Sequence, residues 1–190
     1  MPVQHIEIRG LQVALATLDP QLVRRASVRT INDIVKKSRT TTTTEIRKNY
    51  TVKAAILKKH MTIQFATNSG RPGKLIVKGG RFALTSFEKT TWKPSFKGVS
   101  VKIKRDGGRY QIHHSFLATV TKGPAKGQTW AFERIKKGGK RVWRTPIRHV
   151  TTLGPVEMFT QDRVDATVQA LVDAEWPTGF RRNYADYASK

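Results

Sequence analysis

The chain has 190 residues, of which 36 are Lys or Arg and 13 are Asp or Glu, giving a formal net charge of +23. Hydrophobic residues make up 38% of the chain, which is enough for a packed core and excludes a wholly disordered basic protein. The absence of Cys excludes disulfides and thiolate metal sites, and favours a protein of the cell interior or of an assembled particle. Apolar runs are only a few residues long, so we expect no membrane span and no signal peptide.

The positive charge is not spread evenly along the chain. From Thr151 to the end there are four basic and six acidic residues, a net charge of −2. Residues 1–150 carry 32 basic and seven acidic residues, a net charge of +25. A polyanion is the expected partner of residues 1–150, because each Lys or Arg placed on a phosphate releases condensed counterions. A membrane surface would attract these residues too, but no basic amphipathic anchor with Trp or Phe on its apolar side is recognisable.

The first third of the chain has helical patterns. Residues 2–10 alternate apolar and polar side chains and predict a short strand, and residues 11–18 predict one or two helical turns. Asp19 and Pro20 are typical of a helix start, and apolar residues spaced by three and four predict a helix reaching about Asn49. This helix includes the β-branched run of residues 40–44, which has low helix propensity. A shorter helix is expected to follow, capped by Thr51 and ending at Lys58 or Lys59, with three residues facing inward: Val52, Ala55 and Ile56.

Strand patterns occupy the middle of the chain. Residues 61–65 alternate, residues 68–73 break the chain, and residues 75–77 predict a short strand. The clearest hairpin joins residues 99–103 to residues 110–114 through Asp106-Gly107-Gly108. A second runs from residues 130–134 through Gly138-Gly139 to residues 141–145. The glycines of residues 123–127 lack the spacing of a phosphate-binding loop and are typical of a hairpin turn.

The last part of the chain predicts a helix over residues 156–175, stopped by Pro177, and then a short helix or arm over residues 180–187. The order of helices, antiparallel strands and a final helix indicates an α+β fold. We expect a single domain over residues 1–190. Its parts are helical over about 10–59, antiparallel β over about 60–150, and a helix with an arm over 151–190.

Catalytic and metal-binding motifs are missing from the sequence. The five His residues are scattered, and neither HExxH nor GxSxG occurs. His113 and His114 are adjacent on a predicted strand, where successive side chains point to opposite faces. We therefore expect a protein that is not an enzyme and has no metal or cofactor, although a metal-free nuclease using His and Lys stays an alternative.

Basic residues around the two hairpins are the stronger functional signal. Lys and Arg on edge strands also protect against aggregation, so this structural explanation stays open beside the functional one. The functional explanation is contact with nucleic-acid phosphates without reading of bases. No helix-turn-helix, zinc finger or aromatic RNA-binding sheet is recognisable. With three residues of the long helix, the candidate contacts are Lys36, Lys37, Arg39, Lys102, Lys104, Arg105, Arg109, Lys136, Lys137, Lys140, Arg141 and Arg144.

Residues 141–159, RVWRTPIRHVTTLGPVEMF, carry a pattern of a known family. They resemble the signature near the C-terminus of phage minor tail proteins of the Z family, the tail-completion type of lambda-like phages. There an Arg-x-Pro-Ile stretch leads through a short strand and a Gly-Pro step into the last helix. The early Gly-Leu, the segment RTIND at residues 29–33 and the basic helix over residues 51–59 are also similar to the family. Residues 68–96 have no counterpart in it.

The resemblance implies a structural virion protein rather than an enzyme. Such a protein forms a homo-oligomeric ring, expected to be sixfold, at the neck or head-proximal end of the tail, where it completes the tail for head joining. The implied partners are other copies of the chain, the tail terminator, the connector, the tail tube, and the double-stranded genomic DNA in the channel. The implied location is the virion, and the host cytoplasm during assembly.

Within the motif the resemblance implies structural roles, either in packing or, as the alternative, at the interface between ring subunits. Pro146 and Pro155 would fix backbone direction, Gly154 would allow a sharp turn, and Ile147 and Phe159 would anchor the core. A ribosomal-type or other non-sequence-specific nucleic-acid-binding protein is the alternative, since it would also be short, basic and free of Cys.

Overall fold

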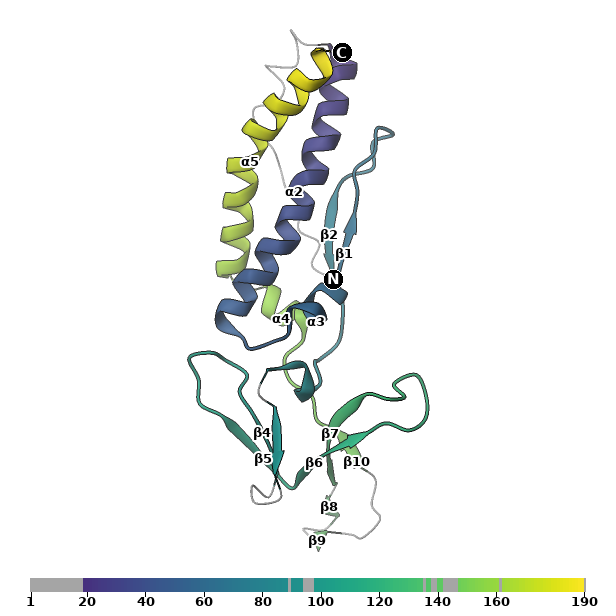
Figure 1. Cartoon of the computed structure of the whole chain (residues 1–190), viewed down its shortest axis with the longest axis vertical. Helices are drawn as coiled ribbons and strands as arrows, with labels where there is room; N and C mark the ends of the chain where they lie inside the picture. Colours follow the sequence, from purple (N-terminus) through teal and green to yellow (C-terminus); the bar gives the residue numbers. More distant parts are fainter. Residues whose placement is uncertain are drawn as a thin grey trace. The chain divides into compact units, whose positions relative to one another are not determined.

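The computed structural model describes residues 19–88, 90–93, 98–134, 136–137, 140–141, 147–160 and 162–189 (Figure 1). The predictions for residues 2–18 and for Gly138-Gly139, and the candidates Arg144 and Pro146, lie outside these residues. The α+β class is confirmed: a long helix and a short helix precede antiparallel sheets and a C-terminal helix. None of the described helices is long and apolar enough to cross a membrane.

The chain divides into two compact units. Unit 1 comprises residues 1–45, 58–78 and 159–190, and unit 2 comprises residues 46–57 and 79–158. The prediction of a single domain stays a prediction. The helices are α2 (Pro20–Asn49), α3 (Ala54–Lys59), α4 (Pro155–Phe159) and α5 (Asp162–Ala188), with a 3₁₀ turn η1 (Leu84–Ser86). The strands are β1 (Met61–Gln64), β2 (Lys74–Val77), β3 (Thr91–Lys93), β4 (Gly98–Val101), β5 (Tyr110–His113), β6 (Ser115–Thr119), β7 (Thr129–Arg134), β8 (Lys136–Lys137), β9 (Lys140–Arg141) and β10 (Ile147–His149).

Helices α2 and α5 lie side by side in unit 1 and run antiparallel (Figure 1). The start of α2 is as predicted, because the Asp19 carboxylate accepts a hydrogen bond from the Gln21 amide at 2.8 Å. The helix continues through the Thr run, where Thr43 and Thr44 donate to the carbonyl groups four residues earlier. The core between the helices contains Ile34, Val172 and Trp176.

The prediction that Pro177 ends the last helix is wrong, because α5 continues through it to Ala188. A proline inside a helix costs about 3 kcal/mol, since it removes one backbone hydrogen bond and crowds the preceding turn. Here the rings of Trp176, Phe180 and Tyr184 stack in succession with centroids 5.9 and 6.0 Å apart. Trp176 and Phe180 also pack against the core formed with α2. This packing compensates the proline penalty, which sequence periodicity alone does not reveal.

A β-hairpin in unit 1 packs against α2. Strands β1 and β2 lie where the patterns predicted them, and they pair antiparallel, with Met61 opposite Val77 and Gln64 opposite Lys74. The side chain of Asn32 on α2 joins the hairpin by accepting from the Ala66 amide at 2.7 Å and donating to the Ala66 carbonyl at 3.2 Å. The Asn32 side chain therefore holds the segment that follows β1 against α2.

The prediction that Thr51 caps the short helix is wrong. Its hydroxyl donates to the Lys102 carbonyl, and the Ile56 and Leu57 amides of α3 donate to the Lys53 carbonyl. Of the three residues expected to face inward, Val52 is fully buried, Ile56 is half-buried and Ala55 is exposed; Leu57 is the buried residue of α3. The reason is that Tyr50 and Val52 form isolated β-bridges with Lys104 and Phe87, so that this segment is extended before α3 begins.

Unit 2 contains two three-stranded antiparallel sheets, in the orders β3-β4-β5 and β10-β7-β6, and the two-stranded β8-β9. The first predicted hairpin is confirmed, with Val99 opposite Ile112. Of the second, the described residues contain the pair of Lys136 with Arg141, while Arg134 lies opposite Ile147 of β10. Strand β6 was not predicted; it pairs with β7 through the turn at residues 123–127, where Gly123 and Gly127 both have φ of +84°.

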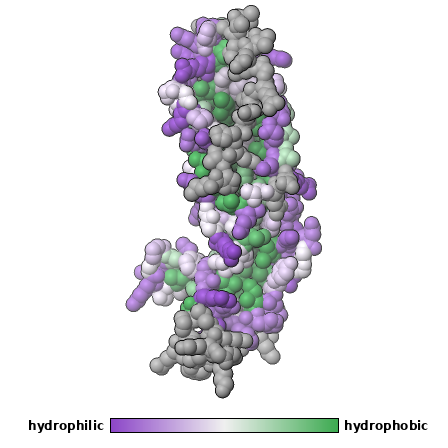
Figure 2. All heavy atoms as spheres, turned by 180° about the vertical axis from the view of Figure 1, so that it is seen from behind, coloured by the Kyte–Doolittle hydropathy of each residue, from purple (hydrophilic) through white to green (hydrophobic). Residues whose placement is uncertain are grey.

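The interior of unit 2 is formed mainly by its sheets and η1. Val99 and Val101 on β4, Ala131 on β7, and Leu84 and Phe87 around η1 are buried. In the view of Figure 2 hydrophilic residues cover much of the surface, and apolar residues show between them. Trp92 and Tyr110 are among the exposed large hydrophobic residues of unit 2, at 46% and 54%.

Candidate nucleic-acid interface

Most of the excess positive charge belongs to unit 2. Its residues include 20 Lys or Arg and four Asp or Glu, whereas unit 1 has 16 and nine. Unit 2 therefore has a formal net charge of +16 and unit 1 one of +7. Because the two units are built from separated stretches of sequence, this partition differs from the division at Thr151, and it places the polyanion-attracting charge in one compact body.

Three of the four acidic residues of unit 2 are engaged within the unit. Glu88 forms an ion pair with Arg47 at 2.8 Å, and Glu133 forms one with Arg148. The Glu157 carboxylate accepts a hydrogen bond from the Gly154 amide ahead of α4. Internal ion pairs can therefore neutralise only a small part of the positive charge of unit 2.

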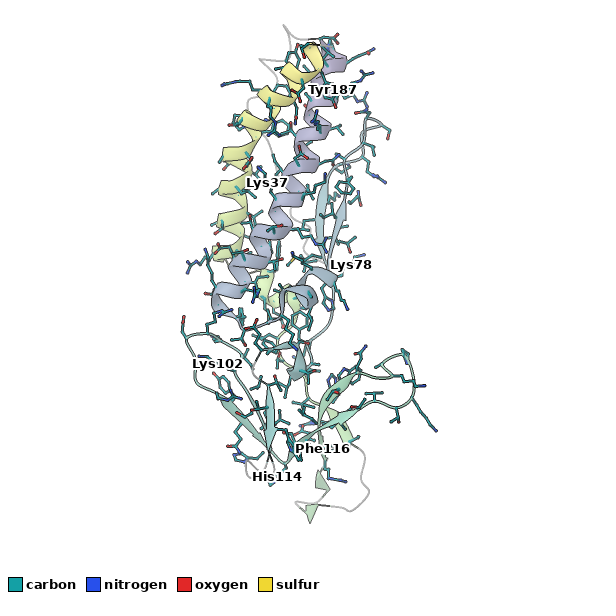
Figure 3. The ribbon with its side chains drawn as sticks, in the orientation of Figure 1. Lys37, Lys78, Lys102, His114, Phe116 and Tyr187 are labelled. Atoms are coloured by element: carbon teal, nitrogen blue, oxygen red, sulfur yellow. The ribbon has the colours of Figure 1, made fainter. Side chains whose placement is uncertain are left out.

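Two segments of unit 2 combine their basic residues. The Thr51 amide donates to the Ile103 carbonyl at 2.9 Å, and the Arg105 amide donates to the Asn49 carbonyl at 2.8 Å. The Arg105 guanidinium also donates to the Arg47 carbonyl at 2.5 Å. These bonds hold residues 102–105 beside residues 47–53 (Lys102 is labelled in Figure 3). We call the result the basic cluster, which consists of Arg47, Lys48, Lys53, Lys102, Lys104 and Arg105.

The basic cluster is accessible. The side chains of Lys48, Lys53, Lys104 and Arg105 are exposed, and those of Arg47 and Lys102 are half-buried. The acidic residues closest in sequence to its two segments are Asp106 and Glu45. Several cations held by one backbone framework can contact successive phosphates of a nucleic acid without reading its bases.

The candidate Arg109 has a different place from the rest of its hairpin. Its guanidinium donates to the Ser100 hydroxyl at 2.9 Å and to the Thr91 hydroxyl at 2.7 Å. It therefore joins the side chains of β3 and β4 across one face of the sheet. This is a structural role, and it leaves Lys102, Lys104 and Arg105 as the hairpin residues of the cluster.

The three candidates on α2 belong to unit 1, where polar groups satisfy them. Lys37 forms an ion pair with Glu175 at 2.6 Å, Lys36 lies 3.8 Å from Asp33, and Arg39 donates to the Lys58 carbonyl at 2.6 Å. The acidic residues of α5 thus serve partly to compensate α2. Lys136, Lys137, Lys140 and Arg141 lie on the paired strands β8 and β9, but their side chains lie outside the described part of the chain.

The described residues of the family-like motif have three different kinds of surroundings. Ile147 on β10 is 48% exposed, so the expectation that it anchors the core is wrong: it lies opposite the exposed Arg134 on a sheet face open to solvent. Phe159 is buried as expected. Gly154 and Pro155 form the step into α4, and a Cβ on Gly154 would lie only 3.0 Å from the Gly80 carbonyl oxygen.

The described histidines lie in separate surroundings. No group of three or more His, Cys, Asp or Glu there could hold a metal ion. His149 stacks on Trp130 with ring centroids 4.4 Å apart, and burial lowers its pKa from the ordinary value of 6.5. His114 has φ of 65°, which directs the chain from β5 into β6.

Sequence reasoning missed half of the basic cluster. Arg47, Lys48 and Lys53 were part of helix patterns, and only the pairing of residues 49–51 with residues 103–105 brings them to the hairpin. A signal existed in the density of basic residues over 47–53, but its partner segment is about 50 residues away. Comparison of the chain with protein-family models, with curated proteins and with solved structures found no match.

Proposed function

We propose that this chain is a structural protein of a tailed phage, part of a homo-oligomeric ring at the neck or head-proximal end of the tail. Its basic unit 2 contacts double-stranded DNA through phosphates, and it completes the tail for head joining. The observation that carries the DNA contact is the charge of unit 2, 20 basic residues against four acidic ones of which three are engaged.

The setting in a phage particle is supported by the motif at residues 141–159 and by the order of elements. A long helix, antiparallel strands and a C-terminal helix agree with what the resemblance implies, although Gly154-Pro155 leads into the short helix α4, which precedes the last helix α5. Closed rings of identical subunits are a common form of homo-oligomer, and a ring around a channel would present the same basic unit once per subunit. Terminator, connector and tail-tube proteins are the proposed protein partners.

A general non-sequence-specific nucleic-acid-binding protein, of the ribosomal type, is the second candidate. The same excess charge favours it, because phosphate contact requires only accessible cations. The two functions differ in what else the chain binds: the phage protein also assembles with itself and with tails.

DNA contact is tested by fluorescence anisotropy of the full chain with a duplex at several salt concentrations. The variant Lys102→Gln/Lys104→Gln removes two charges of the basic cluster, and Lys36→Gln/Lys37→Gln removes two charges of α2 as a matched control. We expect a strong fall of affinity with salt, and a log–log slope smaller by about 1.8 in the first variant, about 0.9 for each phosphate contact. Equal effects of both variants, or affinity independent of salt, would contradict the proposal.

Assembly is tested by negative-stain imaging and sedimentation of the purified chain with tail tubes. We expect rings and co-sedimentation with the tubes. A monomer that ignores tails and binds nucleic acid would support the second candidate instead, and a monomer that cleaves RNA would contradict both.

A further inference from the structure

The sheet β10-β7-β6 has one face rich in aromatic residues. In the register of this sheet, Phe132 on β7 lies opposite Phe116 on β6 and opposite His149 on β10. Trp130, two residues before Phe132, therefore points to the same face. Four rings from three strands thus share one face, which we call the aromatic face (Phe116 is labelled in Figure 3).

The rings of the aromatic face contact one another. The Phe132 centroid lies 6.1 Å from that of Phe116, 6.4 Å from that of Trp130 and 6.0 Å from that of His149. All four side chains are half-buried rather than buried, whereas Ala131 and Ser115 on the opposite face are buried. The core of unit 2 therefore lies behind the sheet, and the aromatic face is turned outward.

Positive charge accompanies these rings, and negative charge does not. The Arg134 guanidinium lies over the Phe116 ring, 5.5 Å from its centroid, and Arg134 is exposed. Lys122 and Lys126 are in the loop that joins β6 to β7. Among the residues that the register places on this face, which also include Ala118 and Ile147, none is acidic, since Glu133 lies on the opposite face.

We propose that the aromatic face binds single-stranded nucleic acid by stacking unpaired bases on its rings. Sheets that bind single strands combine aromatic side chains, on which successive bases stack, with basic groups that follow the backbone. A duplex hides its base faces, so this site would not use the double-stranded DNA proposed for the basic cluster. The inference does not depend on the phage setting, and it assigns this sheet a ligand class of its own.

A protein partner is the other class of ligand that an outward aromatic face could take. The surrounding cations and the absence of a carboxylate on the face favour a polyanion with flat apolar groups, which describes unpaired bases on a phosphate backbone. Arg134 is suited to both the bases and the phosphates, because a guanidinium can stack on a base and bond to a phosphate.

The test compares binding of a labelled 20-nucleotide oligo-dT and of a duplex by the full chain. Phe116→Leu/Phe132→Leu removes two rings and keeps apolar side chains, whereas Phe116→Tyr/Phe132→Tyr keeps the rings. The matched control, Trp92→Leu/Tyr110→Leu, removes two exposed aromatic residues of the other sheet. We expect the first variant to lose about 5- to 150-fold in affinity for oligo-dT per stacked base, while the Tyr variant, the control and duplex binding change less than about twofold.

A second measurement keeps the test decisive where the Leu variant fails to fold. In a chain whose Trp92, Trp143 and Trp176 are replaced by Phe, oligo-dT is expected to quench the fluorescence of Trp130, and the duplex is not. Unchanged oligo-dT affinity in a folded Leu variant, or absence of quenching, would overturn the proposal. A changed oligomeric state of the Leu variant at unchanged oligo-dT affinity would assign the face to a protein partner instead.

Discussion

The substitution Asn183→Asp replaces one NH₂ group by an oxygen at a fully buried position of α5. The Asn183 side chain donates to the Thr30 hydroxyl at 3.0 Å, and this hydroxyl itself donates to the Ala26 carbonyl at 2.8 Å. The side-chain oxygen Oδ1 of Asn183 is buried and has no hydrogen-bond partner among the described residues. An aspartate here would therefore meet no donor unless the Thr30–Ala26 hydrogen bond broke.

The loss of folding stability expected from Asn183→Asp depends on pH. Loss of the Asn183–Thr30 hydrogen bond costs about 1 kcal/mol, and an uncompensated buried charge costs about 3–5 kcal/mol. The nearby Arg29 and Arg182 do not compensate it, because both are largely solvated and lie by Asp186 and Asp33, respectively. Burial raises the folded-state pKa of the new carboxyl above its unfolded value of about 3.9. Protonation limits the charge penalty to about 1.36 kcal/mol per pH unit above that value, about 1.5 kcal/mol at pH 5.

The sign of the effect follows from this shift. A carboxyl whose folded pKa is raised binds more protons in the folded state, so the variant is most stable at low pH and loses stability as pH rises from about 4. Urea unfolding followed by the helical signal at 222 nm, for both proteins at pH 5 and pH 8, measures the difference. We expect the variant to be destabilised by about 1.5–3.5 kcal/mol more at pH 8 than at pH 5. An equal and small destabilisation at both pH values would show that residue 183 is solvated, and would refute the packing of α5 on α2 at this point.

Two further predictions concern unit 2. Gly98→Ala should destabilise the chain by about 1–3 kcal/mol in thermal unfolding, because the new Cβ would lie 2.1 Å from the Ile112 carbonyl oxygen of the paired strand. Gly108→Ala is the control, because its Cβ meets no atom within 4 Å. Equal stabilities of the two variants would contradict the register of β4 with β5. His149→Phe should keep the ring stack on Trp130 but remove a pH dependence of folding stability. Because burial lowers the folded pKa of His149 below 6.5, the wild type has the full stability contribution of this residue above pH 6.5 and loses it as the pH falls below that value. The urea midpoint of the wild type should therefore drop more between pH 7.5 and pH 5.5 than that of the variant. Parallel pH profiles of the two proteins would argue against this burial.

The sequence predicts elements of the fold correctly where the signal is local. Asp19-Pro20 marked the start of α2, the alternation at residues 99–101 marked β4, and the glycines at 123 and 127 marked a turn. Each of these depends on neighbours within a few residues, which is the range over which capping, periodicity and turn chemistry act. The prediction that Pro177 ends the last helix is wrong because the effect of this proline depends on packing against α2, a segment about 140 residues earlier in the chain.

The candidate sites were harder to predict, because they depend on strand register. Nothing near Phe116 indicates that it lies opposite Phe132, and nothing near Lys53 indicates that residues 102–105 lie beside it. Arg109 illustrates the converse: its sequence context is that of the other hairpin cations, but Ser100 and Thr91 bind its guanidinium. Charge and residue type thus indicated a kind of partner, while the groups that could meet that partner emerged only from tertiary pairing.

The interleaving of the two units has a consequence for synthesis on the ribosome. The chain passes from one unit to the other four times, after residues 45, 57, 78 and 158, and unit 1 needs both α2 and α5. At a translation rate of about 5–20 residues per second, about 7–28 s pass between the synthesis of the end of α2 and that of the end of α5. The synthesis of unit 2 is completed within that interval. Unit 2 can therefore mature first, and its hairpins would be the first part of a nascent chain able to meet a polyanion, while the apolar stripe of α2 is still without its final cover.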